Sequence, residues 1–333
     1  MFGQTHLMNE EQKMRVLVTG GAGFVGSNYV RRILDGTLSG VTVVTVLDKL
    51  SYAGSRANLS KVDKESFEFI EGDICDVKLV SELAKRHDVI INFAAESHVD
   101  RSIINPKDFV ITNILGTQTL LDAANRGVIG TFIQVSTDEV YGSISEGSWV
   151  ESDPLLPNSP YAASKASAEL ISRAYFKTFG LDVRITRCSN NYGPYQFPEK
   201  IIPLFVTNLI DGIKVPVYGD GHNVRDWLHV DDHCGGIHSV LQRGLAGETY
   251  NIGGGTELTN LELTYKILSL MSRSNEMLEY VGDRLGHDER YSVDASKIMT
   301  ELSYKPQVDW EVGIANTVNW YLENESWWRQ LKK

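Results

Sequence analysis

The sequence has few cysteines, and no two of them lie close together. Cys75, Cys188 and Cys234 are the three cysteines among 333 residues, so no CxxC spacing occurs. This pattern excludes the disulfide framework of small secreted proteins, and no metal site is evident. Scattered, reduced thiols favour a cytoplasmic location.

Long hydrophobic runs are also missing. No segment reaches the roughly 20 apolar residues that a membrane-spanning helix needs, so we expect no membrane contact. Residues 1–13 are polar, lack the apolar core of a signal peptide and precede the first expected strand. We expect them to form a flexible N-terminal extension.

Basic residues are outnumbered by acidic ones. The 32 Lys and Arg against 43 Asp and Glu give a net charge of −11 and a pI of about 5.3. This charge argues against a nucleic-acid partner, so any anionic ligand must meet a local group of basic residues. The hydrophobic fraction of 42% and the chain length suffice for one large domain or two closely associated ones.

A glycine-rich turn joins the first expected strand to the first expected helix. Residues 14–19 (MRVLVT) are typical of a buried strand, and a helical pattern covers residues 24–34. Glycines between them let backbone amides approach a pyrophosphate, which the helix N-terminus stabilises. The glycines are Gly20, Gly23 and Gly26 in the segment GGAGFVGS.

The next strand supports a dinucleotide site at this turn. It covers residues 41–47 and leads to Asp48, where a carboxylate can bind the ribose hydroxyls of adenosine. Asp48 would repel a 2′-phosphate. We therefore expect NAD rather than NADP as the cofactor.

Strands and helices alternate up to about residue 190 and become irregular afterwards. The alternation predicts an α/β fold with a Rossmann-like, doubly wound parallel sheet over residues 14–190, into which later segments are interleaved. Residues 191–333 are expected to form mainly a smaller, mixed α/β lobe. Further expected strands are 67–70, 89–93, 131–135, 183–187, 215–218 and 249–252, and further expected helices are 77–86, 106–126, 203–211, 230–243, 260–272 and 310–324.

Three polar residues follow the expected strand at 131–135. Thr137, Asp138 and Glu139 should emerge at its carboxyl end, where open α/β sheets bind their ligands. Two adjacent acidic residues at the end of a strand are usually just exposed to solvent. If burial and mutual repulsion separate their pKa values, however, one can act as an acid and the other as a base.

Tyr161 and Lys165 lie four residues apart on an expected helix and so share one face. A cationic Lys165 under the Tyr161 phenol would favour the ionised phenol, which could then act as a base near neutral pH. The same spacing occurs in exposed stripes without function. Its place close to a probable NAD site favours a redox centre.

Several cations of the second half stand in loops beside glycine or aromatic residues, in GDGHNVRDW and GDRLGHDERY. They could be scattered surface charges, but an anion-binding lobe requires such an arrangement. The residues concerned are Lys200, Arg225, Arg284, His287 and Arg290.

Seven motifs occur together in a specific order. They are GGAGFVGS, AAESHVDRS, STDEVYG, YAASK, RCSNNYGPYQFPEK, VRDW and GHDERY. From about Met14 to Trp328 the chain resembles the extended short-chain dehydrogenase/reductases and, more closely, the dTDP-glucose 4,6-dehydratase family. The adjacent acids separate it from the 4-epimerases of the same superfamily, which lack them. GDP-mannose dehydratases keep a Glu but resemble the chain less elsewhere.

The resemblance implies a mechanism and a role for each catalytic residue. NAD takes a hydride from C4 of the glucose ring while Tyr161, assisted by Lys165, removes the hydroxyl proton and Thr137 holds the oxygen. Glu139 then removes the C5 proton, and Asp138 donates to the departing C6 hydroxyl, so that water leaves. Hydride returns to C6 and C5 is reprotonated. The product is the 4-keto-6-deoxy sugar, a deoxysugar precursor.

The resemblance also implies the binding residues and the assembly. Residues 191–333 become mainly a nucleotide-sugar-binding lobe for dTDP-glucose, and two copies form a homodimer by packing the helices after Gly116 and around Tyr161. The implied cofactor contacts are the three glycines, Phe24, Val25, Asp48, Lys49, Leu50, Ser51, Asp73, Ile74, Phe93, Ala94, Ala95, Ser97, Thr112, Tyr161, Lys165 and Asn191. The implied substrate contacts are Ser97, Thr137, Asn190, Lys200, Ile201, Pro216, Val217, Tyr218, Arg225, Asn260, Asp283, Arg284 and His287.

Two alternatives remain open. A dehydratase or 4-epimerase acting on another nucleotide sugar would share most of these motifs. A non-catalytic NAD-binding regulator on the same fold would not need the complete set of Thr137, Asp138, Glu139, Tyr161 and Lys165.

Overall fold

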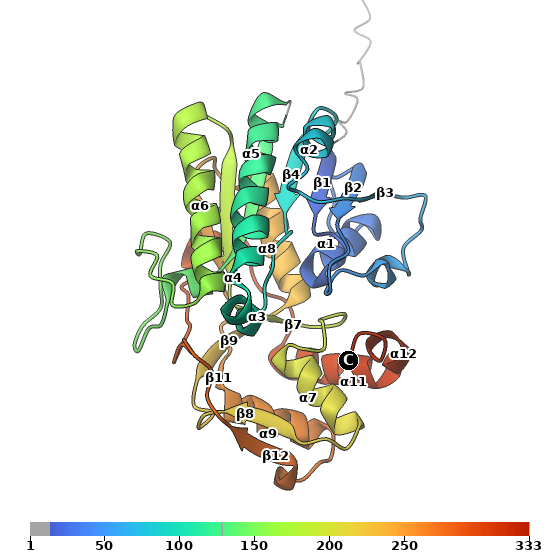
Figure 1. Cartoon of the computed structure of the whole chain (residues 1–333), viewed down its shortest axis with the longest axis vertical. Helices are drawn as coiled ribbons and strands as arrows, with labels where there is room; N and C mark the ends of the chain where they lie inside the picture. The colour runs from blue at the N-terminus through green and yellow to red at the C-terminus, as the bar shows by residue number, and fades with distance from the viewer. Residues whose placement is uncertain (1–13, 128, 333) are drawn as a thin grey trace, which may run out of the picture.

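The computed structural model describes residues 14–127 and 129–332, so the prediction for residues 1–13 lies outside the described residues. Seven parallel strands form the central sheet, in the order β10-β6-β5-β4-β1-β2-β3 (Figure 1). This confirms the predicted doubly wound α/β fold. The strands are β1 (Arg15–Thr19), β2 (Val43–Asp48), β3 (Glu68–Glu71), β4 (Val89–Asn92), β5 (Thr131–Thr137), β6 (Val183–Cys188) and β10 (Thr249–Ile252).

Helices cover both faces of this sheet. One apolar cluster joins the sheet to α1 (Phe24–Leu34), α8 (Val230–Arg243) and α10 (Ser296–Leu302). A second cluster joins the other face to α2 (Val77–Ala84), α5 (Thr117–Arg126) and α6 (Pro160–Phe179). A strand that is buried on both faces has a continuous apolar sequence rather than an alternation of apolar and polar residues. This is why these strands could be predicted from the sequence.

The expected helix at 106–126 is not uniform. It consists of α4 (Pro106–Phe109), a π-helical segment η2 (Val110–Gly116) and α5. In the wider π turns, Asn113 donates to the Glu96 backbone oxygen (3.0 Å) and to the Ser164 hydroxyl (2.8 Å). The π segment thereby ties the loop after β4 to α6, a tertiary requirement that apolar periodicity does not report.

The second lobe, seen below the sheet in Figure 1, has its own apolar core. Two small sheets and several helices enclose it. Its strands are β7 (Asn190–Tyr192), β8 (Val215–Tyr218), β9 (Val224–His229), β11 (Glu257–Thr259) and β12 (Leu278–Val281), and its helices are α7 (Ile201–Ile210), α9 (Asn260–Leu270), α11 (Trp310–Glu323) and α12 (Glu325–Trp328). The lobe also contains the short segment η4 (Asn275–Met277), and short helical segments elsewhere are α3 (Val99–Ile104), η1 (Arg56–Leu59) and η3 (Asp138–Tyr141).

Arg225 lies within strand β9, whereas the sequence was read as a loop there. The strand was missed because Arg225 and Asp226 are both charged and both buried, which removes the usual alternation. The Arg225 guanidinium donates to the Asp288 backbone oxygen (2.9 Å). Asp226 accepts from the backbone N–H groups of Gly254 and Thr256 (2.9 and 2.8 Å).

Two segments after residue 190 belong to the large layer. β10 is an edge strand of the seven-stranded sheet, paired with β6, and α8 packs beside α1. They are later segments of the kind expected to interleave with the first 190 residues. None of the helices in the described residues combines the length and the apolar character needed to cross a bilayer.

Candidate active site

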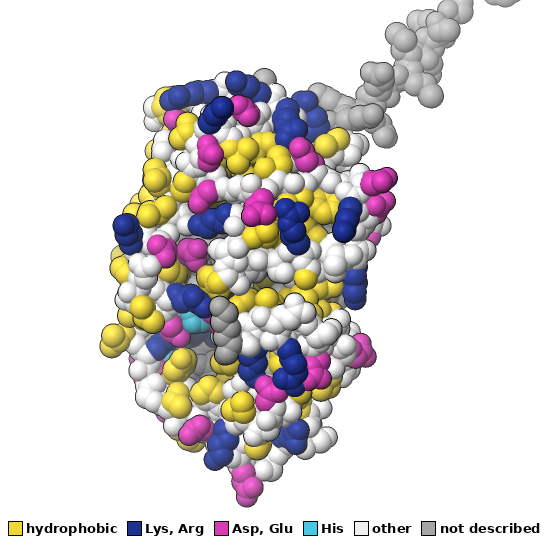
Figure 2. All heavy atoms as spheres, turned by 45° about the vertical axis from the view of Figure 1, so that its right-hand side comes forward, with side chains coloured by type: hydrophobic (Ala, Val, Ile, Leu, Met, Phe, Trp, Pro, Cys, Tyr) yellow, Lys and Arg dark blue, Asp and Glu magenta, His cyan; other side chains and the backbone are white. Residues whose placement is uncertain are grey.

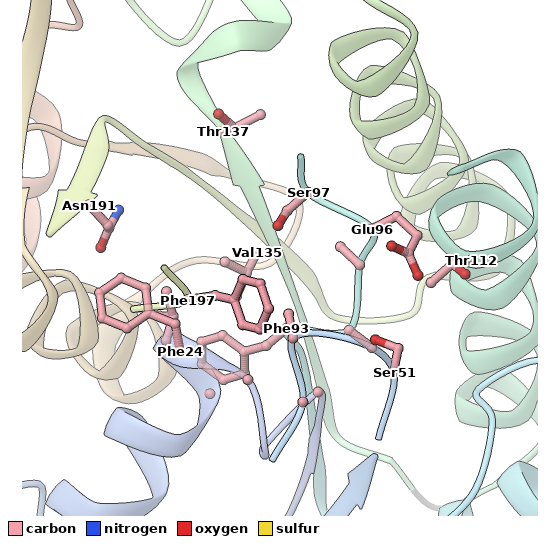
Figure 3. Close-up of a pocket in the computed structure, with 18 of the residues that line it drawn as sticks. Phe24, Ser51, Phe93, Glu96, Ser97, Thr112, Val135, Thr137, Asn191 and Phe197 are labelled. Carbon is pink, nitrogen blue, oxygen red and sulfur yellow. The ribbon is translucent and has the colours of Figure 1, made fainter. Parts of the chain in front are cut away.

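A cleft opens at the carboxyl ends of β1, β2, β4 and β5, and the second lobe closes its other side. Figure 3 shows Thr137 at the end of β5, with Ser97, Glu96 and Thr112 on one side and Asn191 on the other. Most of the predicted residues line this cleft. They are Gly20, Gly23, Phe24, Val25, Gly26, Asp48, Lys49, Ser51, Ile74, Phe93, Ala94, Ala95, Ser97, Thr112, Thr137, Asp138, Glu139, Tyr161, Lys165, Asn190, Asn191 and Lys200.

The glycine-rich turn forms a closely packed cradle. Gly20 has a φ of +67°, and a Cβ there would lie 2.6 Å from the Ala94 nitrogen. A Cβ on Gly26 would lie 2.3 Å from the Gly20 oxygen. Gly23 precedes α1 and has no side chain, so the first backbone N–H groups of α1 stay available to an anion.

Carboxylates and a lysine flank this cradle. Asp48 accepts from the Ala22 nitrogen (2.9 Å) and the Leu50 nitrogen (2.8 Å), which fixes the carboxylate at the end of β2. The Lys49 ammonium donates to Thr112 (3.1 Å) and lies 3.6 Å from the Asp73 carboxylate. An anion-binding turn followed by a carboxylate on the next strand fits the diphosphate and ribose of a dinucleotide.

Buried polar atoms in the cleft also indicate a place where a ligand can bind. Asp138 Oδ2, Asn190 Oδ1 and His233 Nε2 have no hydrogen-bond partner among residues 14–127 and 129–332. All three residues line the cleft. Buried polar groups normally have partners, so these three atoms are places where a bound molecule can supply one.

Tyr161 and Lys165 share the cleft-facing side of α6, which begins at Pro160 and is capped by Ser159. The Lys165 ammonium donates to the Val135 oxygen (2.6 Å), and burial lowers its pKa to about 8. Burial and the Glu139 charge raise the pKa of the Tyr161 phenol well above its usual value, although a hydrogen bond with Thr137 opposes this. These surroundings favour the neutral phenol, and a further positive charge in the cleft would lower its pKa.

The surroundings of Asp138 favour its protonated form. The side chain is buried, its Oδ1 accepts from the Thr137 hydroxyl (3.1 Å), and Thr137 in turn accepts from the Glu139 nitrogen (3.3 Å). Burial, followed by the negative charge of Glu139, raises the pKa of Asp138 well above its usual value. A protonated carboxyl group can donate a proton to a leaving group.

Glu139 has different surroundings. Burial raises its pKa as well, but the charges of Arg284, Lys200 and Arg225 oppose the rise. Glu139 therefore ionises more readily than Asp138. Two adjacent carboxyl groups whose environments separate them in this way can serve as one base and one acid.

The remaining predicted residues do not line the described cleft. Val217 is buried in the core of the second lobe, and Arg290 is paired with Glu257 (2.7 Å). His287 bonds to Asp283 (2.7 Å). Predicted residues outside the lining are Leu50, Asp73, Ile201, Pro216, Val217, Tyr218, Arg225, Asn260, Asp283, Arg284 and His287.

Other residues in the cleft were missed. Tyr52 and Phe197 lie against each other from opposite lobes, and Arg101 stacks over Tyr52 while donating to Glu199 (3.0 Å). Phe197 and Glu199 belong to the motif RCSNNYGPYQFPEK and so could have been found, whereas His233 of α8 has no local signal. The missed lining residues are Leu47, Tyr52, Ala53, Gly54, Gly72, Val135, Ser136, Cys188, Ser189, Gln196, Phe197, Glu199 and His233.

A buried ion pair fixes the acid-bearing turn relative to α6. Arg187 of β6 donates to Glu169 of α6 at 2.7 and 2.9 Å, and also to the Tyr141 hydroxyl at 2.6 Å. Glu169 lies one turn after Lys165, and Tyr141 ends the η3 segment that carries Glu139. One guanidinium thus holds both elements that supply the reactive side chains.

Comparisons with known proteins agree with this geometry. The sequence profile described as "GDP-mannose 4,6 dehydratase" matches residues 17–317. A dTDP-glucose 4,6-dehydratase of Streptomyces niveus is 57% identical over 322 residues, which cover 96% of each chain. The chain belongs to the dTDP-glucose 4,6-dehydratase family. This confirms the resemblance that the motifs suggested.

Solved structures of dTDP-glucose 4,6-dehydratases and more distant enzymes share the fold. DesIV, the dTDP-glucose 4,6-dehydratase of Streptomyces venezuelae, was crystallised with NAD and is 58% identical, with a TM-score of 0.95 over 96% of this chain and 100% of DesIV. The UDP-glucuronic acid 4-epimerase of Bacillus cereus, solved with UDP-glucuronic acid and NAD, is 28% identical, with a TM-score of 0.86 over 93% of this chain and 99% of the epimerase. The sequence therefore separates dehydratase from epimerase more clearly than the fold does.

Proposed function

We propose that this chain is an NAD-dependent dTDP-glucose 4,6-dehydratase, a hydro-lyase of deoxysugar biosynthesis. It converts dTDP-glucose to dTDP-4-keto-6-deoxyglucose and water. One observation carries the proposal: the two adjacent acids Asp138 and Glu139 have unequal surroundings. They stand beside Tyr161 in a cleft that fits a dinucleotide.

NAD binding is supported by the glycine cradle and by Asp48 at the end of β2. When bound, NAD supplies reversible hydride transfer. The nicotinamide ring of NAD carries a positive charge, and a positive charge near Tyr161 would favour the ionised phenol. Tyr161 would then accept the proton of the C4 hydroxyl, with Thr137 holding the oxygen and Lys165 fixing α6 to the Val135 backbone (2.6 Å).

The elimination step follows from the acid pair. A ketone at C4 acidifies the C5 proton, which the Glu139 carboxylate accepts. The protonated Asp138 donates to the C6 hydroxyl, so that water leaves with both electrons of the C6–O bond. Arg225 and His287 are the proposed ligands of the substrate diphosphate, since their N–H groups can donate to phosphate oxygens.

The test is to incubate the purified protein with dTDP-glucose and weigh the product. We expect the loss of one water, incorporation of deuterium at C5 in heavy water, and transfer of a C4 deuterium to C6 within one molecule. UDP-, GDP- and CDP-linked sugars serve as parallel substrates. A product of unchanged mass would indicate epimerisation instead. If only another nucleotide sugar were dehydrated, that sugar would be the substrate in place of dTDP-glucose.

We further propose that the enzyme is a cytoplasmic homodimer. The three cysteines are free thiols. Apolar side chains of η2 and α6 are exposed to solvent in the single chain, among them Leu115 (50%) and Leu170 (57%). In the view of Figure 2, Lys and Arg side chains are interspersed with Asp and Glu.

A further inference from the structure

The C-terminal segment of the chain reaches back to the glycine-rich turn. Trp327 of α12 donates its indole N–H to Asn58 Oδ1 (3.0 Å), across 269 positions of sequence. The Asn58 side-chain amide donates to the Ala22 oxygen (2.8 Å) inside the cradle. Figure 1 shows α11 and α12 beneath the sheet, on the side of α1.

The orientation of the Asn58 amide is unambiguous. An indole N–H can only donate, so the amide oxygen must face Trp327 and the NH₂ group must face Ala22. Asn58 is buried in η1, and its backbone oxygen accepts from Arg31 (2.7 Å). Both ends of the amide are therefore satisfied, and a rotation would break both bonds.

Hydrogen bonds hold the backbone of Ala22 at both its nitrogen and its oxygen. Its nitrogen donates to Asp48 (2.9 Å), and its oxygen accepts from Asn58 and from the Ser55 nitrogen (3.0 Å). A peptide unit is planar, so fixing the Ala22 oxygen also fixes the direction in which the chain enters Gly23 and α1. The backbone N–H groups that would meet a diphosphate start from this point.

The C-terminal helices also support the opposite wall of the cleft. Tyr321 of α11 donates to the backbone oxygen of Gln196, a residue of the cleft lining (2.5 Å). Tyr195 packs between Trp320 and Trp327, with ring centroids 4.6 and 5.5 Å away, and Arg31 stacks on it at 4.2 Å. Tyr195 has a φ of +68°, a strained conformation that its packing maintains.

We propose that Trp327 and Asn58 are positioning residues of the cofactor site. Neither lines the cleft. They keep the glycine-rich turn in the conformation that binds the NAD diphosphate, so the end of the substrate lobe contributes to cofactor affinity. This inference rests on the proposed use of NAD.

Adjacent tryptophans provide a matched test. Trp328 is fully buried and donates its indole N–H to the Tyr321 backbone oxygen (2.9 Å), within the C-terminal segment itself. Trp327→Phe and Trp328→Phe each keep an aromatic ring and remove one donor. The full-length protein, freed of nucleotide, is titrated calorimetrically with NAD and, separately, with dTDP.

We expect Trp327→Phe to weaken NAD binding about three- to tenfold and to leave dTDP binding unchanged, because one hydrogen bond that orders the turn is lost. Trp328→Phe should lower the melting temperature with NAD affinity unchanged. Equal NAD affinities for the Trp327→Phe variant and the wild type would overturn the inference. So would equal losses in the two variants.

A second variant tests the hydrogen bond between Trp327 and Asn58 by changing Asn58. Asn58→Ala should weaken NAD binding, and adding Trp327→Phe to it should have little further effect, because both act through one amide. Fully additive losses would contradict the proposed relay. A wild-type protein that binds no NAD would instead overturn the proposed function, so the two failures are distinguishable.

Discussion

Asp138 and Glu139 are neighbours in the chain, yet three cationic side chains act on Glu139 and oppose the rise of its pKa. Asp138 has burial and a negative neighbour as its main influences, and both raise its pKa. The assignment of roles follows from these surroundings. Asp138 is suited to donate a proton and Glu139 to accept one.

Replacing the proposed base should separate oxidation from elimination. We expect Glu139→Gln to lower product formation by about 10²- to 10⁴-fold, because an amide cannot take the C5 proton. Oxidation at C4 does not need this carboxylate. Reduced nicotinamide should therefore accumulate on the enzyme, as measured by its absorbance after mixing with dTDP-glucose.

The exposed Glu146 provides a control for that substitution, since Glu146→Gln makes the same chemical change away from the cleft. Its turnover should match the wild type. Normal turnover by Glu139→Gln would mean that another group removes the C5 proton.

The acidic limb of the pH–rate profile should report Glu139. The group must be ionised to act, and burial raises its pKa above the ordinary 4.5, so kcat should fall as pH decreases through a midpoint above that value. Arg284 is the foremost of the cations that oppose the rise. Arg284→Gln should therefore move the midpoint to higher pH.

Arg284→Lys keeps the positive charge and should leave the midpoint near that of the wild type. The measurement is kcat against pH at saturating substrate for the three proteins. If the midpoint were the same in Arg284→Gln and the wild type, the acidic limb would report a group other than Glu139.

Residues that follow an apolar strand could be predicted to lie at a site, because strand ends meet at one edge of the sheet. Thr137, Asp138 and Glu139 are of this kind. The link between Trp327 and Asn58 has no local signal, since it depends on how the lobes fold together. The environment of a residue, such as the charges around Glu139, is likewise set by tertiary structure.

At the scale of elements, α6 carries Tyr161, Lys165 and Glu169 at successive four-residue steps, so one helix face holds both reactive groups and their support. Glu169 is paired with Arg187 of β6 at 2.7 Å, and both side chains are buried. The ion pair therefore fixes the helix against the sheet. Its loss should affect stability more than a surface pair would.

Arg187→Met should destabilise the fold by about 3–5 kcal/mol, because it leaves the Glu169 carboxylate buried without its partner. Urea denaturation measures this loss. Adding Glu169→Leu removes the unpaired charge and should recover part of the stability. Arg126→Met, at the exposed pair with Asp122, should cost about 0–1 kcal/mol; equal effects at the two sites would refute the argument.

Apolar periodicity predicted the long buried strands and most amphipathic helices. It did not predict strand β9, where buried charges replace the alternation, or the π-helical turns of η2. In both places polar bonds to distant segments determine the backbone. Such bonds depend on the assembled fold rather than on the local sequence.

At the scale of the whole molecule, exposed leucines on η2 and α6 predict a partner surface. We expect light scattering to give the mass of a homodimer, since burying Leu115 and Leu170 in a helix bundle removes apolar area from water. Leu170→Glu should shift the protein toward the monomer. A wild-type monomer would contradict the proposed assembly.

Leu245→Glu is the matched control for that experiment. Leu245 is 62% exposed and follows α8, outside η2 and α6. Its substitution should leave the mass unchanged. An equal shift in both variants would indicate general destabilisation rather than a lost interface.

The late position of β10 has a consequence for synthesis on the ribosome. Strand β6 is complete at Cys188, but its partner β10 ends only at Ile252. Until those further residues have been translated and released, the nascent sheet exposes an unpaired edge that can join other chains. A fragment stopped at residue 190 should therefore aggregate, and the growing chain needs protection over this interval.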